Sequence, residues 1–366
     1  MCAWQVEAPA GPAKHNFDSS DLQTKTDLIR NMTDKKYDVF GVGNALVDIL
    51  AQVPDDLVAS FELQKGSMTL MDSDQQAEVL NKLEQNSIQL ASGGSAANTM
   101  VAIAQSGGSG VYIGRVAHDP HGEFYQKDME EAGIGFPVDL ASEASFPTGT
   151  SVILTTPDAE RTMCTHLGIS TSLAKTDVDF DLLSASKISY VEGYLWHSDD
   201  PRAVCIETFE QSRKQGIKTS FTFSDSFLVD AFKDDFAKIV DDYCDIIFCN
   251  ADELRKFIGV EDLEQCNKQM APRIELAFVT DGPNGCYVLK NGAIEHVPGF
   301  DIKAIDTVGA GDAFAGGALY GLTNGMSETQ SARWGNYFAS KVVAKIGPRL
   351  DTDMKGELET VLASRT

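Results

Sequence analysis

The chain has 366 residues, 43% of them hydrophobic and 23% charged, which is an ordinary composition for a globular protein of one large or two moderate domains. Lys and Arg total 30 against 54 for Asp and Glu, so the formal net charge is -24. Such a surface repels nucleic acid and anionic membranes, and no apolar run approaches the roughly 20 residues that span a bilayer. We therefore expect neither nucleic acid nor membrane as a partner.

The cysteines and the first residues bear on where the protein works. The seven cysteines are dispersed, with no CxxC pair and no Cys/His group at zinc spacing, as is typical of reduced thiols in a cytoplasmic protein. Residues 1–34 are polar and unpatterned and lack the apolar core of a secretory signal. We expect them to be a disordered leader or an upstream mis-start, followed by a single domain over 35–366.

From residue 35 on, apolar strand patterns alternate with helical ones. Strands are predicted over 37–43, 111–117, 187–194, 218–224, 245–250 and 275–282, and helices over 98–108, 122–133 and 201–216. This alternation predicts parallel βαβ units, in which ligands bind beyond the carboxyl ends of the strands. Two stretches, about 50–72 and 144–167, instead carry short strand-like runs without helices between them. They are expected to form a small separate sheet that acts as a lid.

The segment DTVGAGDAF, residues 306–314, joins a glycine turn to a predicted helix start. Gly309 and Gly311 allow the backbone to approach a ligand closely, and free N–H groups at a helix start near Ala310 bind anions. Asp312 follows at once, where it would accept the proton of a hydroxyl that attacks a bound phosphoryl group. Taken alone, the same letters also fit an acidic residue at an ordinary helix start.

Two motifs in the first third of the chain place polar side chains among small or apolar residues. SGGSAANT, at 92–99, fits either a ligand-binding turn or a simple helix cap. Its candidate binding residues are Gly93, Gly94, Ser95 and Asn98. GVGNALVDIL, at 41–50, begins like a dinucleotide fingerprint, but Leu46 stands where a third small residue belongs. Asp48 is expected either to bind a vicinal diol, because a carboxylate in this apolar setting is costly to bury without hydrogen bonds, or to be an ordinary aspartate at a strand end or in a loop.

Further candidates lie in the lid and after the later strands. NADE, at 250–253, either caps a helix or offers hard oxygen ligands to Mg²⁺. TDGPNG, at 280–285, forms a turn after a strand. Arg161 would reach a phosphate when the lid closes, or else stay on the surface.

Together these motifs resemble the ribokinase-like (PfkB) family of carbohydrate and nucleoside kinases over roughly 37–350. Three stretches, FPTGTSVILTTPDAERTMCTHLGIS, YVEGYLW and IGPR, are similar to the bacterial adenosine kinase branch. The resemblance implies an α/β fold, a three-layer α/β/α sandwich with a mostly parallel central sheet and a small β-sheet lid. It also implies ATP- and Mg²⁺-dependent phosphorylation of a nucleoside 5′-hydroxyl, adenosine to AMP in purine salvage above all, with K⁺ as a further expected ion.

The resemblance assigns a role to each candidate residue. Asp312 is the base, the N–H groups of Gly309, Ala310 and Gly311 stabilise the transferring phosphoryl group, and Arg161 joins them on lid closure. The acceptor is held by Asn44, Asp48, Gly93, Gly94, Ser95 and Asn98. Leu195 either belongs to an apolar wall for a purine or packs in the core. ATP is bound by Thr280, Gly282 and Gly285, and Mg²⁺ by Asn250 and Glu253 through water. Asn336 either faces the adenine of ATP or is an asparagine packed within its helix.

Three questions stay open at this point. The acceptor is a nucleoside or, alternatively, a sugar such as fructose or ribose, because the AAN that follows the glycine pair and Asn336 depart from the animal-type adenosine kinases. A non-catalytic nucleotide-binding protein is the alternative of another class. The protein is expected to be a monomer or a homodimer.

Overall fold

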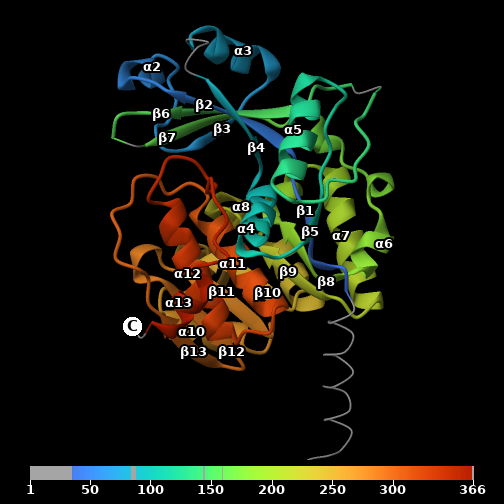
Figure 1. Ribbon diagram of the computed structural model, residues 1–366, viewed down its shortest axis with the longest axis vertical. Helices are drawn as coiled ribbons and strands as arrows, with labels where there is room; N and C mark the ends of the chain where they lie inside the picture. The colour runs from blue at the N-terminus through green and yellow to red at the C-terminus, as the bar shows by residue number, and fades with distance from the viewer. Residues whose placement is uncertain (1–34, 84–87, 143–144, 159, 365–366) are drawn as a thin grey trace, which may run out of the picture. The chain divides into compact units, whose positions relative to one another are not determined.

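An eight-stranded sheet runs through the centre of the structure (Figure 1). The computed structural model describes residues 35–83, 88–142, 145–158 and 160–364, so the expected leader at 1–34 lies outside the described residues. In spatial order the strands are β13 (Ala293–Val297), β12 (Cys286–Lys290), β11 (Leu276–Thr280), β10 (Ile246–Asn250), β9 (Lys218–Thr222), β8 (Ser186–Glu192), β1 (Tyr37–Val42) and β5 (Gly110–Ile113). Neighbours from β11 to β5 pair in parallel, and only β12 and β13 are antiparallel. This confirms the mostly parallel sheet that the alternating patterns predicted.

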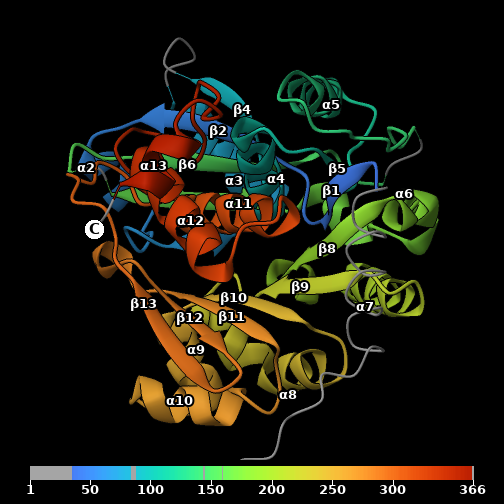
Figure 2. The ribbon, with the colours of Figure 1, turned by 60° about the horizontal axis from the view of Figure 1, so that its bottom comes forward.

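Helices cover both faces of the sheet and complete three layers (Figure 2). One face carries α4 (Ser95–Ser106), α11 (Ala310–Thr323) and α12 (Glu328–Val342), with α13 (Leu358–Ala363) packed on α12. The other carries α6 (Phe180–Ser184), α7 (Asp199–Lys214), α8 (Ser226–Asp242), α9 (Ala251–Ile258) and α10 (Leu263–Met270). Short 3₁₀ turns are η2 (Gly168–Ser172), η3 (Lys175–Asp177), η4 (Gly193–His197) and η5 (Gly282–Asn284). No helix among the described residues is long and apolar enough to cross a membrane.

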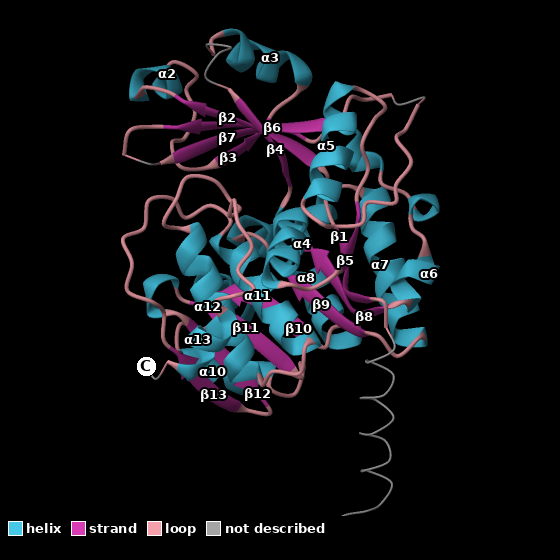
Figure 3. Cartoon of the chain, viewed as in Figure 1, coloured by secondary structure: helices cyan, strands magenta, loops and turns pink. Residues whose placement is uncertain are grey.

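A second sheet of five strands, which we call the lid, lies beside the first (Figure 3). Its order is β3 (Met68–Leu70), β7 (Arg161–His166), β6 (Gly149–Thr155), β2 (Leu46–Gln52) and β4 (Gln89–Gly93). It is accompanied by α2 (Asp55–Ala59), α3 (Ser73–Asn81) and, next to β2 and β4, α5 (Pro120–Glu131). The lid is therefore larger than predicted, since β4 and the start of β2 fall outside the two expected segments. The expectation of a helix-free first segment is wrong, because α2 lies within it.

Successive side chains along each lid strand point alternately toward the lid helices and toward the central sheet. Ile49, Val152 and Cys164 pack in a small core with residues of α2 and α3. Their neighbours on the same strands, such as Asp48 and Ser151, point the other way and line a cavity. The lid is thus apolar on its outer face, under its own helices, and mixed in character on the inner face.

Candidate active site

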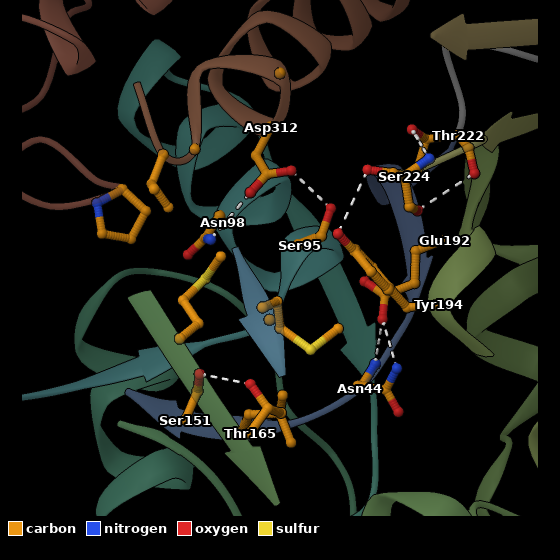
Figure 4. Close-up of a pocket in the computed structure, with 18 of the residues that line it drawn as sticks. Asn44, Ser95, Asn98, Ser151, Thr165, Glu192, Tyr194, Thr222, Ser224 and Asp312 are labelled. Carbon is orange, nitrogen blue, oxygen red and sulfur yellow. Dashed lines mark hydrogen bonds between the residues drawn. The ribbon is translucent and has the colours of Figure 1, made fainter. Parts of the chain in front are cut away.

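A cavity of about 370 Å³ lies where the lid faces the carboxyl ends of the parallel strands (Figure 4). Glu192, Thr222, Asn250 and Thr280, which end β8, β9, β10 and β11, all line it. Parallel strands bring their carboxyl ends to one edge, so residues far apart in sequence meet there. The predicted position of the site, at the strand ends under the lid, is the observed position of the cavity.

The glycine turn at the start of α11 forms one wall of the cavity. Gly309 adopts a left-handed φ of 76°, and a Cβ there would lie 2.6 Å from Pro348 Cβ, so a side chain does not fit. Among the described residues, none accepts a hydrogen bond from the backbone N–H of Gly311 or Asp312. Both residues line the cavity, and α11 is 14 residues long. The turn therefore presents free N–H groups and the positive end of a helix dipole, which suit an anion.

Asp312 is held in place by two side chains of α4. Ser95 Oγ donates to Asp312 Oδ1 over 2.6 Å, and Asn98 Nδ2 donates to Oδ2 over 3.0 Å (Figure 4). Burial raises the pKa of Asp312 to about 6, although the two hydrogen bonds and the charge of Arg349 oppose the shift. At neutral pH the group is a carboxylate with a raised proton affinity, as a general base requires.

A second carboxylate, Asp48 on β2, faces the same cavity. Gly93 and Gly94 let the backbone pass close to it and to Asn44. A Cβ on Gly93 would lie 2.3 Å from Asp48 Oδ1, and one on Gly94 would lie 2.1 Å from the Asn44 carbonyl oxygen. Burial raises the pKa of Asp48 to about 7 against the charges of Arg349 and Arg161. No described residue hydrogen-bonds to the Asp48 carboxylate, so its oxygens are open to ligand hydroxyls.

Sequence reasoning missed a third buried carboxylate, Glu192. It accepts hydrogen bonds from the backbone N–H and Nδ2 of Asn44, at 2.7 and 3.0 Å, and from the Ala96 N–H at 2.7 Å. Burial raises the pKa of Glu192 to about 7 against these bonds. Glu192 thus fixes Asn44 and the start of α4. A carboxylate at the end of the apolar run KISYVE was a signal of the same kind as the one used for Asp48.

Asn250 and Glu253 form a capping box at the start of α9 and line the cavity. Asn250 Oδ1 accepts from the Glu253 N–H at 2.8 Å, and the Glu253 carboxylate accepts from the Asn250 N–H and Nδ2. Burial raises the pKa of Glu253 to about 7. The described residues contain no cluster of three His, Cys, Asp or Glu that would enclose a metal directly. The capping box expected from the sequence is therefore the observed arrangement, and both residues line the cavity, where their oxygens could hold a cation through water.

Seven of the predicted site residues do not line the cavity: Gly93, Arg161, Leu195, Gly282, Gly285, Ala310 and Asn336. The Ala310 N–H donates to the Thr307 carbonyl oxygen over 3.2 Å, so, against the prediction, it is not free for a phosphoryl group. Leu195 lies in the main core with 1% of its surface exposed, and its neighbour Tyr194 lines the cavity instead. Asn336 Nδ2 donates to the carbonyl oxygens of Val297 and Pro298, so it braces the loop that leads to the glycine turn. Gly282 and Gly285 shape the turn after Thr280, with φ of 52° and 97°.

Arg161 is also placed differently from the expectation of a phosphate contact. Its side chain is 2% exposed, and Nη2 forms an ion pair with Asp306 Oδ2 over 2.7 Å. Asp306 also accepts hydrogen bonds from the N–H groups of Val308 and Gly347. Arg161 Nε and Nη1 have no hydrogen-bond partner among the described residues. The reason for this position is that a buried guanidinium needs a counter-charge, which Asp306 supplies.

The lid contributes a mostly apolar wall that the sequence did not reveal. Met68, Leu70, Ile153, Met163 and Leu167 line the cavity from this side. Among them, Ser151 Oγ and Thr165 Oγ1 share a hydrogen bond of 2.9 Å. The cavity is thus polar around Asp312 and Asp48 and apolar toward the lid.

A carboxylate beside free helix N–H groups, at the strand ends of a three-layer α/β fold, suits the transfer of a phosphoryl group to an alcohol. The pfkB family of carbohydrate kinases is matched over residues 66–354. The chain belongs to this family, and it is an ATP-dependent phosphotransferase. Its fold is the expected ribokinase-like one, and the non-catalytic alternative is set aside.

Individual relatives include both adenosine and sugar kinases. The adenosine kinase of Saccharomyces cerevisiae is 26% identical over 328 residues, which cover 84% of this chain and 95% of the relative. A structure of a probable sugar kinase from Rhizobium etli has a TM-score of 0.84 and 32% identity, covering 90% of this chain and 99% of the other. The adenosine kinase structure from Sinorhizobium meliloti has a TM-score of 0.83 and 33% identity, covering 89% and 99%.

Proposed function

We propose that the protein uses MgATP to phosphorylate the 5′-hydroxyl of a nucleoside, with adenosine as the main acceptor and AMP as the product. The observation that carries this proposal is the division of the cavity into a polar floor and an apolar lid wall. A nucleoside has the same division, since a hydroxyl-rich ribose is joined to a flat base with apolar faces. The similarity to adenosine kinases from yeast and Sinorhizobium meliloti supports the same acceptor.

The apolar lid wall favours an acceptor that carries a nucleobase over a free sugar. Met68, Ile153 and Met163 offer flexible or branched apolar side chains, and Met in particular adapts to the faces of aromatic groups. Burying apolar surface contributes about 25 cal/mol per Å². A small sugar that fills only the polar floor would leave this wall in contact with water and would gain nothing from it.

Within this proposal the polar floor positions the acceptor. The Asp48 carboxylate accepts hydrogen bonds from the 2′- and 3′-hydroxyls, with Asn44 and Asn98 beside it. The 5′-hydroxyl then lies near Asp312, which takes its proton during attack on the γ-phosphoryl group. The N–H groups of Gly311 and Asp312 face the phosphoryl oxygens and stabilise their charge.

The nucleotide side is proposed from the residues that line the cavity beyond Asp312. Thr280 lies at the end of β11, and Asn250 and Glu253 would hold Mg²⁺ through water. When bound, Mg²⁺ neutralises charge on the nucleotide phosphates. Glu253 is buried and close to its ionisation point, so a cation nearby would favour its charged form.

A sugar kinase is the second candidate, and one observation favours it. The structure from Rhizobium etli with 32% identity is described as a probable sugar kinase. In that case the Ser151–Thr165 hydroxyl pair would bind hydroxyls of the acceptor rather than the edge of a base. Every role proposed for Asp312 and the glycine turn would stay the same.

The test is ADP release from purified protein with MgATP, run in parallel with adenosine, inosine, guanosine, ribose and fructose, each with and without K⁺. Turnover with adenosine and little with ribose or fructose is the expected result. Turnover with a sugar and none with nucleosides would replace the acceptor but keep the catalytic assignments. No turnover with any of the five would contradict the proposed function.

A further inference from the structure

Arg349 lies behind Asp312, in the loop that follows α12. It ends the stretch IGPR, to which the sequence analysis assigned no role in the site. We propose that Arg349 is a positioning residue for phosphoryl transfer: it fixes the side-chain amide of Asn98, which in turn holds Asp312, and it supplies the positive charge that this pair of residues needs. The inference concerns the base and not the acceptor, so it applies equally to a nucleoside and to a sugar.

The hydrogen bonds form a continuous chain from Arg349 to the base. Arg349 Nε donates to Asn98 Oδ1 over 2.8 Å, and Asn98 Nδ2 donates to Asp312 Oδ2 over 3.0 Å. A guanidinium has only donors and a carboxylate has only acceptors. Both neighbours therefore select the same orientation of the Asn98 amide, with its oxygen toward Arg349 and its nitrogen toward Asp312.

Arg349 is itself anchored on its far side. Nη1 donates to Ser92 Oγ over 2.6 Å and lies 3.5 Å from Asp128 Oδ2, and Asp128 accepts from the N–H and hydroxyl of Ser92. Ser92 is fully buried, and the Arg349 side chain is mostly buried. The guanidinium is thus held by α5 and β4 as well as by Asn98, which limits its freedom to move away from the base.

The same loop also touches the anion-binding turn. Pro348 is the residue that packs against Gly309, and the Gly347 N–H donates to Asp306. Residues 347–349 therefore set both the glycine turn and the position of the base. A loop that makes both contacts fixes the position of Asp312 relative to the glycine turn.

The charges around Asp312 explain why a cation is needed there. The other titratable groups that face it from neighbouring elements are Asp48 on β2, Glu192 and Tyr190 on β8, and Tyr194 on η4. Each of these groups is neutral when protonated and negative when deprotonated, so none of them supplies a positive charge. Arg349 is the cation that favours the ionised form of both Asp312 and Asp48, and it thereby lowers the pKa of each against the effect of burial.

The experiment compares Arg349→Met, which removes the charge and the donors, with Arg349→Lys, which keeps the charge without the planar fork. Arg273→Met is the matched control, because Arg273 forms an ion pair with Asp241 away from the cavity. For each protein kcat, KM for ATP and KM for the acceptor are measured between pH 5 and 9. The acceptor is adenosine, or the sugar if a sugar is the one turned over.

We expect Arg349→Met to lower kcat at pH 7 at least tenfold, to leave KM for ATP within about twofold, and to move the acid limb of the kcat profile upward by about one pH unit. Arg349→Lys should keep the acid limb of the kcat profile near its wild-type position but reach a lower maximal kcat. Arg273→Met should match the wild type in all of these quantities. An unmoved limb with kcat within threefold in Arg349→Met would overturn the proposal.

A purely structural role would look different in these measurements. It would lower the thermal midpoint of unfolding, and the measured kcat would fall only as far as the fraction of folded, active protein falls. The dependence of kcat on pH would stay that of the wild type. If Arg349→Met fails to fold, the result for Arg349→Lys decides. A lower plateau of the kcat profile with an unchanged acid limb would support the positioning role of Arg349. A wild-type kcat would contradict it.

Discussion

A substitution at Gly311 can test phosphate binding without lowering the stability of the protein. An ideal Cβ on Gly311 meets no atom within 4 Å, and the residue lies in the first turn of α11 without a left-handed φ. Replacing such a glycine by alanine stabilises a protein by about 0.4–1 kcal/mol, because the unfolded chain loses freedom. Yet Gly311 lines the cavity, and its free N–H is proposed to bind a phosphoryl oxygen. The methyl group of Gly311→Ala would therefore occupy space that the phosphoryl oxygens need.

The size of the effect follows from the contact that is lost. A hydrogen bond to a charged group contributes about 1.5–3 kcal/mol, and 1.36 kcal/mol corresponds to a factor of ten in rate. We therefore expect Gly311→Ala to lower kcat/KM for ATP by about tenfold to a hundredfold. The free energy of unfolding should be equal to or slightly above that of the wild type.

Gly309→Ala provides the contrast. Gly309 has a left-handed φ of 76°, and a Cβ would lie 2.7 Å from Pro348 Cα, so this variant should lose both activity and about 1–2 kcal/mol of stability. Gly356→Ala, where a Cβ also meets nothing within 4 Å, should keep wild-type kinetics, with a free energy of unfolding equal to or slightly above that of the wild type. The assays are steady-state kinetics with MgATP and denaturation in urea. Gly311→Ala with kcat/KM within threefold of the wild type would refute phosphate binding at this turn.

Further predictions concern the base, the lid arginine and the core. Asp312→Asn should bind ATP normally by calorimetry but turn over at least about a hundredfold more slowly, and near-normal turnover would exclude the assigned role. In the wild type kcat should fall as the pH drops through about 6, since protonated Asp312 cannot accept a proton; a rate still flat at pH 5 would contradict this. Arg161→Met should lower the free energy of unfolding by about 3–5 kcal/mol, because Asp306 is left buried without its counter-charge, and adding Asp306→Asn should recover part of that loss in urea denaturation. Leu195→Ala should lower stability by about 2–5 kcal/mol but leave KM for the acceptor within twofold, as suits a core residue; a large rise in KM would place it at the acceptor after all.

The parts of the structure that were predictable are those set by local pattern. The glycine turn, the start of α11 at Ala310 and the strands that end at Asn250 and Thr280 follow from residue type and spacing along the chain. Backbone freedom at glycine and the period of apolar residues act over a few positions, so the sequence reveals them directly.

What could not be predicted depends on contacts between distant segments. The stretch YVEGYLW allows Leu195 either in the acceptor wall or in the core, and the 3₁₀ turn η4 directs its neighbour Tyr194 to the cavity and Leu195 into the core. Arg349 reaches Asn98 across 251 positions of sequence. A side chain so far from its partner carries no local signal, because the fold, not the neighbouring residues, brings the two together.

The buried ion pair between lid strand β7 and the loop before the glycine turn bears on our expectation that the lid opens and closes. While Arg161 and Asp306 are in contact, each charge compensates the other, and once they are fully apart water solvates both. Halfway between, they have lost most of their attraction without gaining water, so partly open positions are the least stable. We therefore expect the lid to behave as a two-state switch. We expect such a switch to keep water from the phosphoryl group while the lid is closed, which favours transfer to the acceptor over hydrolysis of ATP.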